Sequence, residues 1–329
     1  MSDYVTISYE QSGIELDEYL SLMFPALSKG FIRREVSAGH VLIDGEPSLP
    51  SRRLREGETL ILDIDDSEAP LSPMAAKPVE VDVLFENDEI LVVDKPAGLA
   101  SEPERWAPEL GSLAGSVQWM ASQVEGDEAY RPRLVHRLDK DTTGVVVCAK
   151  DLETERHLRG LFEHGGVTKE YLALVEGEHP LADGEEELID LKLGPDGKRG
   201  SKQRVDHRGK DSQTRVSVER RFRGYTLMRC KPLTGRTHQI RVHLAETGFP
   251  LVVDPFYGRR EAFSLSDFKS NYKRKPGRPE RALIGRLTLH AERIQFPTIH
   301  GETLQVESPL PADFVRVLKQ LAKVRPYSR

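Results

Sequence analysis

The 329 residues are 38% apolar and 30% charged, a composition that fits a folded protein with one large domain and one small one. No run approaches the roughly 18 apolar residues of a membrane span, and the residues after Met1 lack the pattern of a signal peptide, so we expect a cytoplasmic protein without a membrane partner. The formal net charge of −6 disfavours binding to a nucleic-acid backbone, but residues 1–70 carry 14 acidic and 6 basic side chains, a net −8, so the remainder carries +2.

The N-terminal end predicts a small module of helices and strands. An apolar stripe over residues 14–24 predicts one helix, and Ser28 can cap a second helix that Gly39 ends. Residues 41–43 predict a strand that enters a tight Asp-Gly turn, and residues 59–64 alternate in a way that predicts the return strand. We therefore expect a compact unit of about 50 residues.

The rest of the chain predicts a second, larger domain. Residues 66–79 hold three prolines and few large apolar residues, which is typical of a linker between residues 1–65 and residues 80–329. Beyond it, β-rich segments separated by Gly, Pro and Asp turns alternate with a few helices, among them residues 151–164 and 313–323. This order predicts an α+β fold with a mixed, mainly antiparallel central sheet and flanking helices and loops, rather than a doubly wound sheet.

Common catalytic and metal-binding signatures are missing from the sequence. There is no GxGxxG after a strand, no Walker A, no GxSxG and no HExxH. His238 and His243 are five residues apart, so one helical face would not present both to a metal. Cys148 and Cys230 lack zinc or disulfide spacing, and we expect two buried thiols. The sequence therefore predicts no metal site.

One acid has neighbours that suit a functional site. Asp139 stands between Arg137 and Lys140 and precedes a Thr-Thr-Gly turn that enters the apolar strand at residues 145–148. An acid at the mouth of a buried strand can line a cleft. Taken alone, however, the pattern favours an ordinary surface ion pair over a catalytic group.

A resemblance to a known family changes this interpretation. The segment "HRLDKDTTG" at residues 136–144 closely resembles the signature of the RluA-type pseudouridine synthases, and further family segments recur in order through most of residues 80–320. These segments are "VVDKPAGL" at 92–99, "KEYLALVEG" at 169–177, "TGRTHQIRVHLAETGFPLVVDPFYG" at 234–258 and "RLTLHA" at 286–291. The N-terminal module resembles the small RNA-binding module first described in ribosomal small-subunit protein four.

The resemblance implies the conversion of uridine to pseudouridine, an isomerisation that needs no cofactor. It implies that Asp139 is the nucleophile, which attacks the ribose anomeric carbon or uracil carbon 6, or assists elimination through a glycal; the sequence leaves these three routes open. Such a carboxylate needs a partner cation, because desolvation alone favours the neutral acid. The family match assigns that role to Arg241, and it assigns stacking on the uracil and late proton removal to Tyr171.

The resemblance also implies a set of RNA contacts. Arg137 would fill the gap left by the flipped base, because a planar guanidinium stacks where a lysine does not. His136 would hydrogen-bond the backbone or RNA, and Lys95 would contact a phosphate. The remaining predicted contacts lie at the polar end of a short helix and on the second helix of the N-terminal module, and are Arg236, His238, Gln239, Lys29, Arg33 and Arg34.

The sequence thus favours a monomeric, cofactor-free isomerase that acts on uridines in structured RNA, most of all large-subunit ribosomal RNA. The same chemistry on transfer RNA is an alternative, and so is a non-catalytic RNA-binding or ribosome-assembly factor that kept the fold. A hydrolase that uses Asp139 and His136 would need a second carboxylate or a triad pattern, which the sequence does not offer.

Overall fold

The computed structural model divides into two compact units, residues 1–80 with 101–132 and residues 81–100 with 133–329. The residues it describes are 3–8, 11–24, 27–64, 78–103, 111–123, 130–197, 202–273, 277 and 279–327. Most of the predicted linker lies outside the described residues. The division into residues 1–65, 66–79 and 80–329 therefore stays a prediction.

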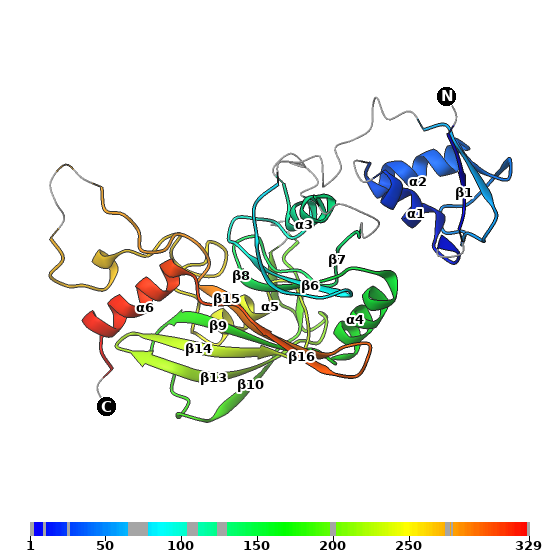
Figure 1. Ribbon diagram of the computed structural model, residues 1–329. Helices are drawn as coiled ribbons and strands as arrows, with labels where there is room; N and C mark the ends of the chain where they lie inside the picture. Colours follow the sequence, from blue (N-terminus) through cyan, green and yellow to red (C-terminus); the bar gives the residue numbers. More distant parts are fainter. Residues whose placement is uncertain are drawn as a thin grey trace. The chain divides into compact units, whose positions relative to one another are not determined.

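The N-terminal unit consists of a four-stranded antiparallel sheet, in the order β1-β4-β2-β3, with helices (Figure 1). Its elements are β1 (Asp3–Thr6), α1 (Leu16–Met23), α2 (Lys29–Ala38), β2 (Val41–Ile43), β3 (Glu46–Pro47), β4 (Thr59–Leu62) and α3 (Leu113–Ser122). The two predicted helices are confirmed. The Asp-Gly turn leads into β3, whereas β4 pairs with the other edge of β2, and β1 was not predicted.

Local chemistry fixes the ends of α2. The Ser28 side chain accepts a hydrogen bond from the backbone N–H of Phe31, and Gly39 ends the helix with φ 87°. That left-handed conformation suits glycine because it has no Cβ. Ile32 and Leu60 are completely buried in a core that the two helices share with the sheet. The module therefore has a hydrophobic core of its own.

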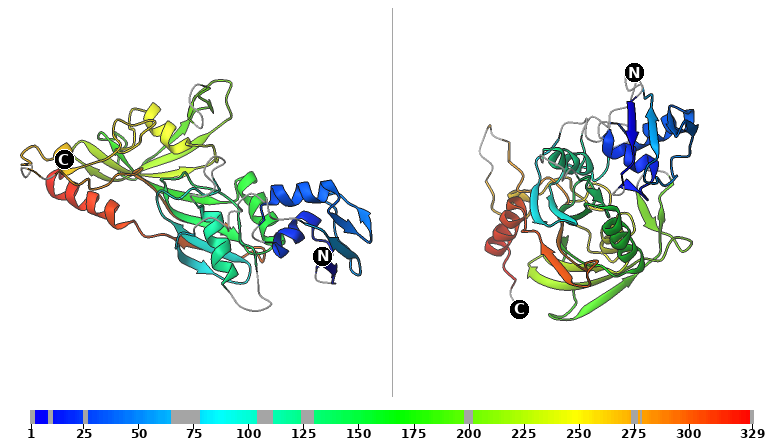
Figure 2. Two further views of the ribbon diagram at one scale, coloured as in Figure 1. Left: turned by 90° about the horizontal axis from the view of Figure 1, so that it is seen from above. Right: turned by 45° about the vertical axis from the view of Figure 1, so that its right-hand side comes forward.

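The second unit is built on a ten-stranded sheet, shown from three sides in Figures 1 and 2. Its main path runs through β10 (Glu186–Asp190), β13 (Gln213–Phe222), β14 (Tyr225–Pro232), β9 (Thr168–Glu176), β15 (Leu289–Pro297), β8 (Thr143–Ala149), β6 (Ile90–Lys95) and β5 (Asp82–Glu86). Off this path, β16 (Thr303–Glu307) pairs with β15 and β7 (Arg133–Leu134) with β8. Among the described strands of this sheet, only β8 and β15 pair in parallel, and the other pairs are antiparallel, so the predicted mixed, mainly antiparallel sheet is confirmed.

The described residues of this unit also form three α-helices and smaller elements. They are α4 (Leu152–His164), α5 (Gln239–Glu246), α6 (Ala312–Val324), the short 3-10 helix η3 (Leu265–Asp267) and the hairpin β11 (Leu193–Pro195) with β12 (Gln203–Val205). The helices predicted over 151–164 and 313–323 are confirmed as α4 and α6. Asp151 caps α4 by accepting from the backbone N–H of Thr154.

Alternation along β9 gives the sheet two different faces. Leu172 and Leu174 join the core beneath α6, whereas Ala173 and Val175 join the core beneath α5. Successive side chains of a strand point to opposite faces, and the left view of Figure 2 shows α5 and α6 on opposite sides of the sheet. Tyr171 contacts the core beneath α5, so this face can carry a site.

The strand β8 is buried along its whole length and is joined closely to β15. Gly144 has φ 116°, and a Cβ added there would lie 2.1 Å from the carbonyl oxygen of Ala291. Only glycine fits this backbone approach. The turn that holds Asp139 directly precedes β8, so this close packing fixes where the turn lies.

Candidate active site

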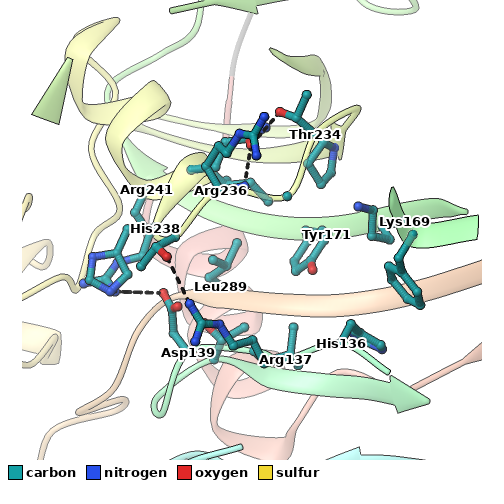
Figure 3. A pocket seen from close by; sticks show the side chains of 18 of the residues that line it. His136, Arg137, Asp139, Lys169, Tyr171, Thr234, Arg236, His238, Arg241 and Leu289 are labelled. Atoms are coloured by element: carbon teal, nitrogen blue, oxygen red, sulfur yellow. Dashed lines mark hydrogen bonds and ion pairs between the residues drawn. The ribbon is translucent and has the colours of Figure 1, made fainter. Parts of the chain in front are cut away.

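A cavity of about 300 Å³ lies between the turn before β8, the strand β9 and the segment that leads into α5 (Figure 3). Its lining residues are Val135, His136, Arg137, Leu138, Asp139, Thr142, Phe162, Lys169, Tyr171, Pro232, Thr234, Gly235, Arg236, Thr237, His238, Gln239, Ile240, Arg241 and Leu289. Concave sites with a few convergent polar groups on apolar walls are the usual form of a ligand site.

At one end of the cavity a carboxylate and a guanidinium from distant segments form an ion pair. Arg241 Nη1 donates to Asp139 Oδ2 at 2.9 Å, although 102 residues separate the two. The Asp139 side chain is 26% exposed, whereas that of Arg241 is 4% exposed. The backbone N–H of Thr142 donates to the Asp139 carbonyl and closes the turn. The carboxylate therefore reaches the cavity while its cation is buried behind it.

Asp254 holds Arg241 from the other side. Nε and Nη2 of Arg241 donate to the two carboxylate oxygens of Asp254, both at 2.8 Å, and Asp254 is fully buried. The rings of Phe256 and Tyr257 lie 5.4 Å and 5.1 Å from the guanidinium carbon. A bidentate carboxylate fixes the plane of a guanidinium. The geometry therefore directs the remaining Nη1 at Asp139.

The charges around Arg241 favour its charged form. Burial lowers the pKa of Arg241, but the hydrogen bond and charge of Asp254, together with Asp139, outweigh burial and leave the pKa above its usual range. Oδ1 of Asp254 also accepts from the backbone N–H groups of Phe256 and Tyr257. Asp254 is thus fixed by the backbone and by Arg241 at once.

His238 lies beside Asp139 in an unusual backbone conformation. Its φ is 55°, and among the described residues it shares a positive φ with only one other non-glycine residue, Asp44. Nδ1 lies 2.9 Å from the Tyr257 hydroxyl, and Nε2 lies 3.8 Å from Asp139 Oδ2. Burial lowers the pKa of His238, while Asp139 acts in the opposite direction. Such strained conformations persist where the surroundings fix them, often at functional sites.

The other end of the cavity is formed by rings and a lysine. Lys169 and Tyr171 are two residues apart on β9 and therefore share a face, and both line the cavity. His136 stacks on Phe162 with ring centroids 4.6 Å apart. Burial, with a smaller effect from the charge of Asp139, raises the pKa of Tyr171. The Tyr171 hydroxyl is therefore neutral and available as a donor or acceptor.

Comparison with known proteins adds an independent result. A family model described as RNA pseudouridylate synthase matches residues 89–246, and one described as S4 domain matches residues 16–60. "Ribosomal large subunit pseudouridine synthase D" of Pseudomonas aeruginosa is 32% identical, and the match covers 99% of this chain and 98% of that protein. The chain belongs to the RNA pseudouridine synthases. It is an isomerase that converts uridine to pseudouridine in RNA.

Other relatives agree. The "Uncharacterized RNA pseudouridine synthase YlyB" of Bacillus subtilis is 31% identical, covering 97% of this chain and 98% of its own length. "Ribosomal large subunit pseudouridine synthase C" of Escherichia coli is 32% identical, with 98% and 97% covered. The solved structure of "Human RNA Pseudouridylate Synthase Domain Containing 1" has a TM-score of 0.51 at 25% identity and covers 74% of this chain and 86% of its own. The predicted RluA-type resemblance and fold are confirmed.

The cavity brings Asp139, Tyr171 and Arg241 together, and their catalytic roles stay predictions. The structure adds Asp254, whose role sequence reasoning missed although it lies in the quoted segment at 234–258. The available signal was an acid placed directly after the apolar run at residues 251–253. Lys169 was missed too, because a lysine at the start of a strand has the pattern of a solvated residue.

Two predicted RNA contacts lie on the exposed rim. Arg137 is exposed, and its Nη2 donates to the hydroxyl of Thr237 at 3.2 Å. Arg236 is exposed, and its Nε donates to the backbone carbonyl of Asp211 at 3.0 Å. Neither arginine has a carboxylate partner among the described residues, so both present positive charge at the cavity, and their RNA contacts stay predictions.

The structure contradicts the predicted phosphate contact of Lys95, whereas the RNA contact of Gln239, which lines the cavity, stays a prediction. Lys95 is completely buried, and its ammonium group donates to the carbonyl oxygens of Pro96, Leu99 and Lys140. It braces the loop after β6 and cannot reach a phosphate. Gln239 is 4% exposed, and its amide bonds within the protein on both sides. It fixes the start of α5, because all of its strong partners are internal.

His136 makes the backbone contact that was one of its two predicted roles. Its Nε2 accepts from the backbone N–H of Val147 at 3.0 Å. Burial, with a smaller contribution from the charge of Lys169, lowers the pKa of His136 to about 3. The ring is therefore neutral at physiological pH and forms an apolar wall of the cavity together with Phe162.

The basic side chains predicted to bind RNA on the S4 domain are partly engaged. Lys29 pairs with Glu18 at 2.6 Å and Arg33 with the buried Asp17 at 2.6 Å. Arg34 is exposed and lies over the ring of Phe31 at 5.4 Å. The pairing reduces the net positive charge that this helix presents, and their RNA contacts stay predictions.

The described part of the chain contains no helix long and apolar enough to cross a membrane, and no group of three His, Cys, Asp or Glu side chains placed to hold a metal ion.

Proposed function

We propose that this pseudouridine synthase modifies large-subunit ribosomal RNA, with Asp139 as nucleophile, Arg241 as its ion-pair partner and Tyr171 against the uracil. The observation that carries the catalytic assignment is the 2.9 Å contact between Arg241 Nη1 and Asp139 Oδ2 at the end of a cavity lined by Tyr171. The ribosomal target is supported by the names of the relatives synthase C and synthase D and by the S4 domain match.

The geometry suits all three routes by which the carboxylate can act. The free face of Asp139 points into the cavity, where it can attack the ribose anomeric carbon or uracil carbon 6, or assist elimination. Arg241 is buried and held by Asp254, so it offers a fixed positive charge that needs no rearrangement during the reaction. Tyr171 provides a neutral ring on which a flipped base can stack.

Base flipping is the role proposed for Arg137. Its guanidinium is exposed at the rim of the cavity and is held there by the hydroxyl of Thr237. Removing a uridine from its stack costs a few kcal/mol, and a planar cation inserted in the gap recovers part of that stacking.

The proposal includes a monomeric enzyme in the cytoplasm, and light scattering would test its oligomeric state.

The test maps pseudouridine in unmodified RNA transcripts by carbodiimide-dependent reverse-transcription stops. Wild type should act on large-subunit ribosomal RNA, and Asp139→Asn should lower the single-turnover rate by more than about 10³-fold. Asp141→Asn, which removes the other acid of the same turn, is the matched control and should retain activity. Retained activity in Asp139→Asn would overturn the nucleophile assignment.

Substrate choice is read from the same assay. Activity on transfer RNA alone would overturn the ribosomal assignment while sparing the chemistry. Tight RNA binding without any product in wild type would favour a non-catalytic assembly factor. The convergence of Asp139, Tyr171 and Arg241 in one cavity argues against that factor, since a protein that only binds RNA has no need of a buried arginine directed at a partly exposed carboxylate.

A further inference from the structure

Lys169 brings a positive charge to the cavity without a counter-charge from the protein. The side chain is mostly buried and lines the wall beside Tyr171 (Figure 3). Among the described residues, Lys169 Nζ has no partner in an ion pair or hydrogen bond, and it lies 5.8 Å from the centroid of the Phe162 ring. Phe162 and the neutral His136 beside it supply no anion.

Two other lysines of the same unit show how a buried or partly buried ammonium group is ordinarily compensated here. Lys95 is completely buried but donates to three carbonyl oxygens. Lys231 lies 3.4 Å from Glu186 and 3.6 Å from Glu170. Lys169 has neither kind of partner. Its setting therefore differs from that of both other lysines.

An uncompensated cation in an apolar wall is unfavourable, because burial removes its water without supplying a replacement. Burial accordingly lowers the pKa of Lys169, with no opposing effect from any carboxylate. Unfavourable groups of this kind are retained where a ligand completes them. The ligand of Lys169 should thus carry an acceptor or negative charge into the cavity.

The proposed substrate places such a group at the right end. Asp139 and Arg241 lie at one end of the cavity, and Lys169 lies at the other, with Tyr171 between them (Figure 3). The atoms that Asp139 can attack are the anomeric carbon and carbon 6, and both are bonded to N1 of the base. Carbonyl oxygen O4 is on the opposite side of the uracil ring. A base on Tyr171 therefore directs O4 toward Lys169.

We propose that Lys169 is a further catalytic residue, whose ammonium group donates to a uracil carbonyl oxygen and stabilises the negative charge that the base carries during the isomerisation. This inference rests on the proposed function. All three routes open to Asp139 place negative charge on O4 of the uracil. Addition at carbon 6 moves an electron pair through carbons 5 and 4 onto O4, and cleavage from ribose leaves an anion shared by N1, O2 and O4.

The same contact serves both halves of the reaction. The electron pair of the bond between the anomeric carbon and N1 leaves with the base and returns as the bond to carbon 5. The proton then lost from carbon 5 is balanced by the one gained at N1, so no co-reactant is needed. Turning the base about the line through N3 and carbon 6 exchanges N1 with carbon 5 and O4 with O2. Lys169 therefore meets a carbonyl oxygen before and after the turn.

A phosphate is the competing ligand. Lys169 also borders a second cavity of about 350 Å³ that includes Arg215 and Lys231. Both of these cations are already close to Glu186, at 3.5 Å and 3.4 Å, so they offer little net charge to a phosphodiester. The neutral wall of the catalytic cavity around Lys169 favours the planar base instead.

The experiment compares Lys169→Met, Lys169→Arg and the control Lys231→Met in the full chain. It measures the single-turnover rate at saturating enzyme, the RNA dissociation constant at several salt concentrations, and thermal unfolding. Lys169→Met should lower the rate by about 10²-fold or more, as loss of one charge-stabilising donor does elsewhere. Its RNA affinity should stay within about threefold, and its unfolding temperature should be unchanged or higher, because an unpaired buried charge is gone. Lys169→Arg should recover part of the rate.

Each other outcome overturns the inference. Lys169→Met could bind RNA more weakly, with the slope of log affinity against log salt concentration smaller by about 1, and keep the wild-type rate at saturating enzyme. That result would mean a phosphate contact. A lower unfolding temperature would mean a structural role, and an unchanged rate would mean no role. A loss of rate in Lys231→Met as large as that in Lys169→Met would mean a general charge effect. Inactivity of wild type itself would instead overturn the proposed function.

Discussion

Replacing Asp254 with asparagine tests whether Asp139, the proposed nucleophile, is positioned from the far side of Arg241. Asparagine keeps the shape of the side chain, and its oxygen can still accept one hydrogen bond. Its amide group, itself a donor, would replace one of the two carboxylate oxygens that accept from Arg241 at 2.8 Å. One of these two hydrogen bonds is therefore lost. Among the described residues, the buried guanidinium then keeps only Asp139, 2.9 Å away, as a charged partner.

The size of the effect follows from burial. Breaking a buried ion pair by removing one charge costs roughly 3–5 kcal/mol, and because Asp139 and two aromatic rings still contact Arg241 we expect the lower value. For a unit of this size about 3 kcal/mol corresponds to a fall of about 6–12 °C in the unfolding temperature. A displaced Arg241 no longer orients Asp139, which should lower the single-turnover rate by about 10²-fold.

Thermal unfolding by circular dichroism and the pseudouridine mapping assay measure the two effects. Asp211→Asn is the matched control, because Asp211 is 78% exposed and pairs with Lys192 at 3.0 Å on the surface. Exposed pairs contribute about 0–1 kcal/mol, so this variant should behave as wild type. If Asp254→Asn unfolds at the wild-type temperature with the wild-type rate, the positioning argument is refuted.

Three further changes test other contacts. The free energy of unfolding should fall as the pH drops from about 6.5 toward 3, because the pKa of His136 is lowered to about 3 and only the unfolded state takes up the proton in this range. Urea titrations of His136→Gln should show a weaker dependence of the free energy of unfolding on pH. The same pH dependence in wild type and variant would contradict this reasoning. Gly144→Ala forces a Cβ to within 2.1 Å of the Ala291 carbonyl oxygen, so the protein should not fold, and a soluble active variant would disprove the packing argument. Arg137→Lys should keep RNA affinity within about threefold but lower the rate about tenfold, because lysine keeps the charge without the stacking plane; equal rates would exclude stacking by Arg137.

Much of the fold could be predicted because its signals are local. Ser28 and Gly39 mark the ends of α2, and Asp151 marks the start of α4, by side-chain and backbone chemistry that acts over three or four residues. The parallel pairing of β8 with β15 is different. It joins Gly144 to Ala291, and periodicity within either strand carries no information about a partner so distant in sequence.

The site shows the same division. Asp139 and Arg241 were found through the family signature, since the residues alone favoured a surface ion pair. The prediction for Lys95 was wrong. A lysine in a loop with proline and glycine suits a phosphate contact, but one of the three carbonyl oxygens that accept from it belongs to Lys140, 45 residues away, which the local sequence cannot indicate. Asp254 was overlooked for a related reason. Its chemistry depends on Arg241, and nothing in its own segment indicates a buried bidentate partner.

The net charge of −6 was the one observation that opposed an RNA partner, and the pairing of individual charges explains why it misleads. On the S4 domain, Lys29 and Arg33 are engaged by Glu18 and Asp17, so acidic residues there offset basic ones locally. At the cavity, Arg137 and Lys169 lack carboxylate partners among the described residues. The local potential that an incoming RNA meets is set by such unpaired groups, because paired charges largely cancel within about one Debye length of roughly 8 Å. A chain that is acidic overall can therefore still present unpaired positive charge at its cavity.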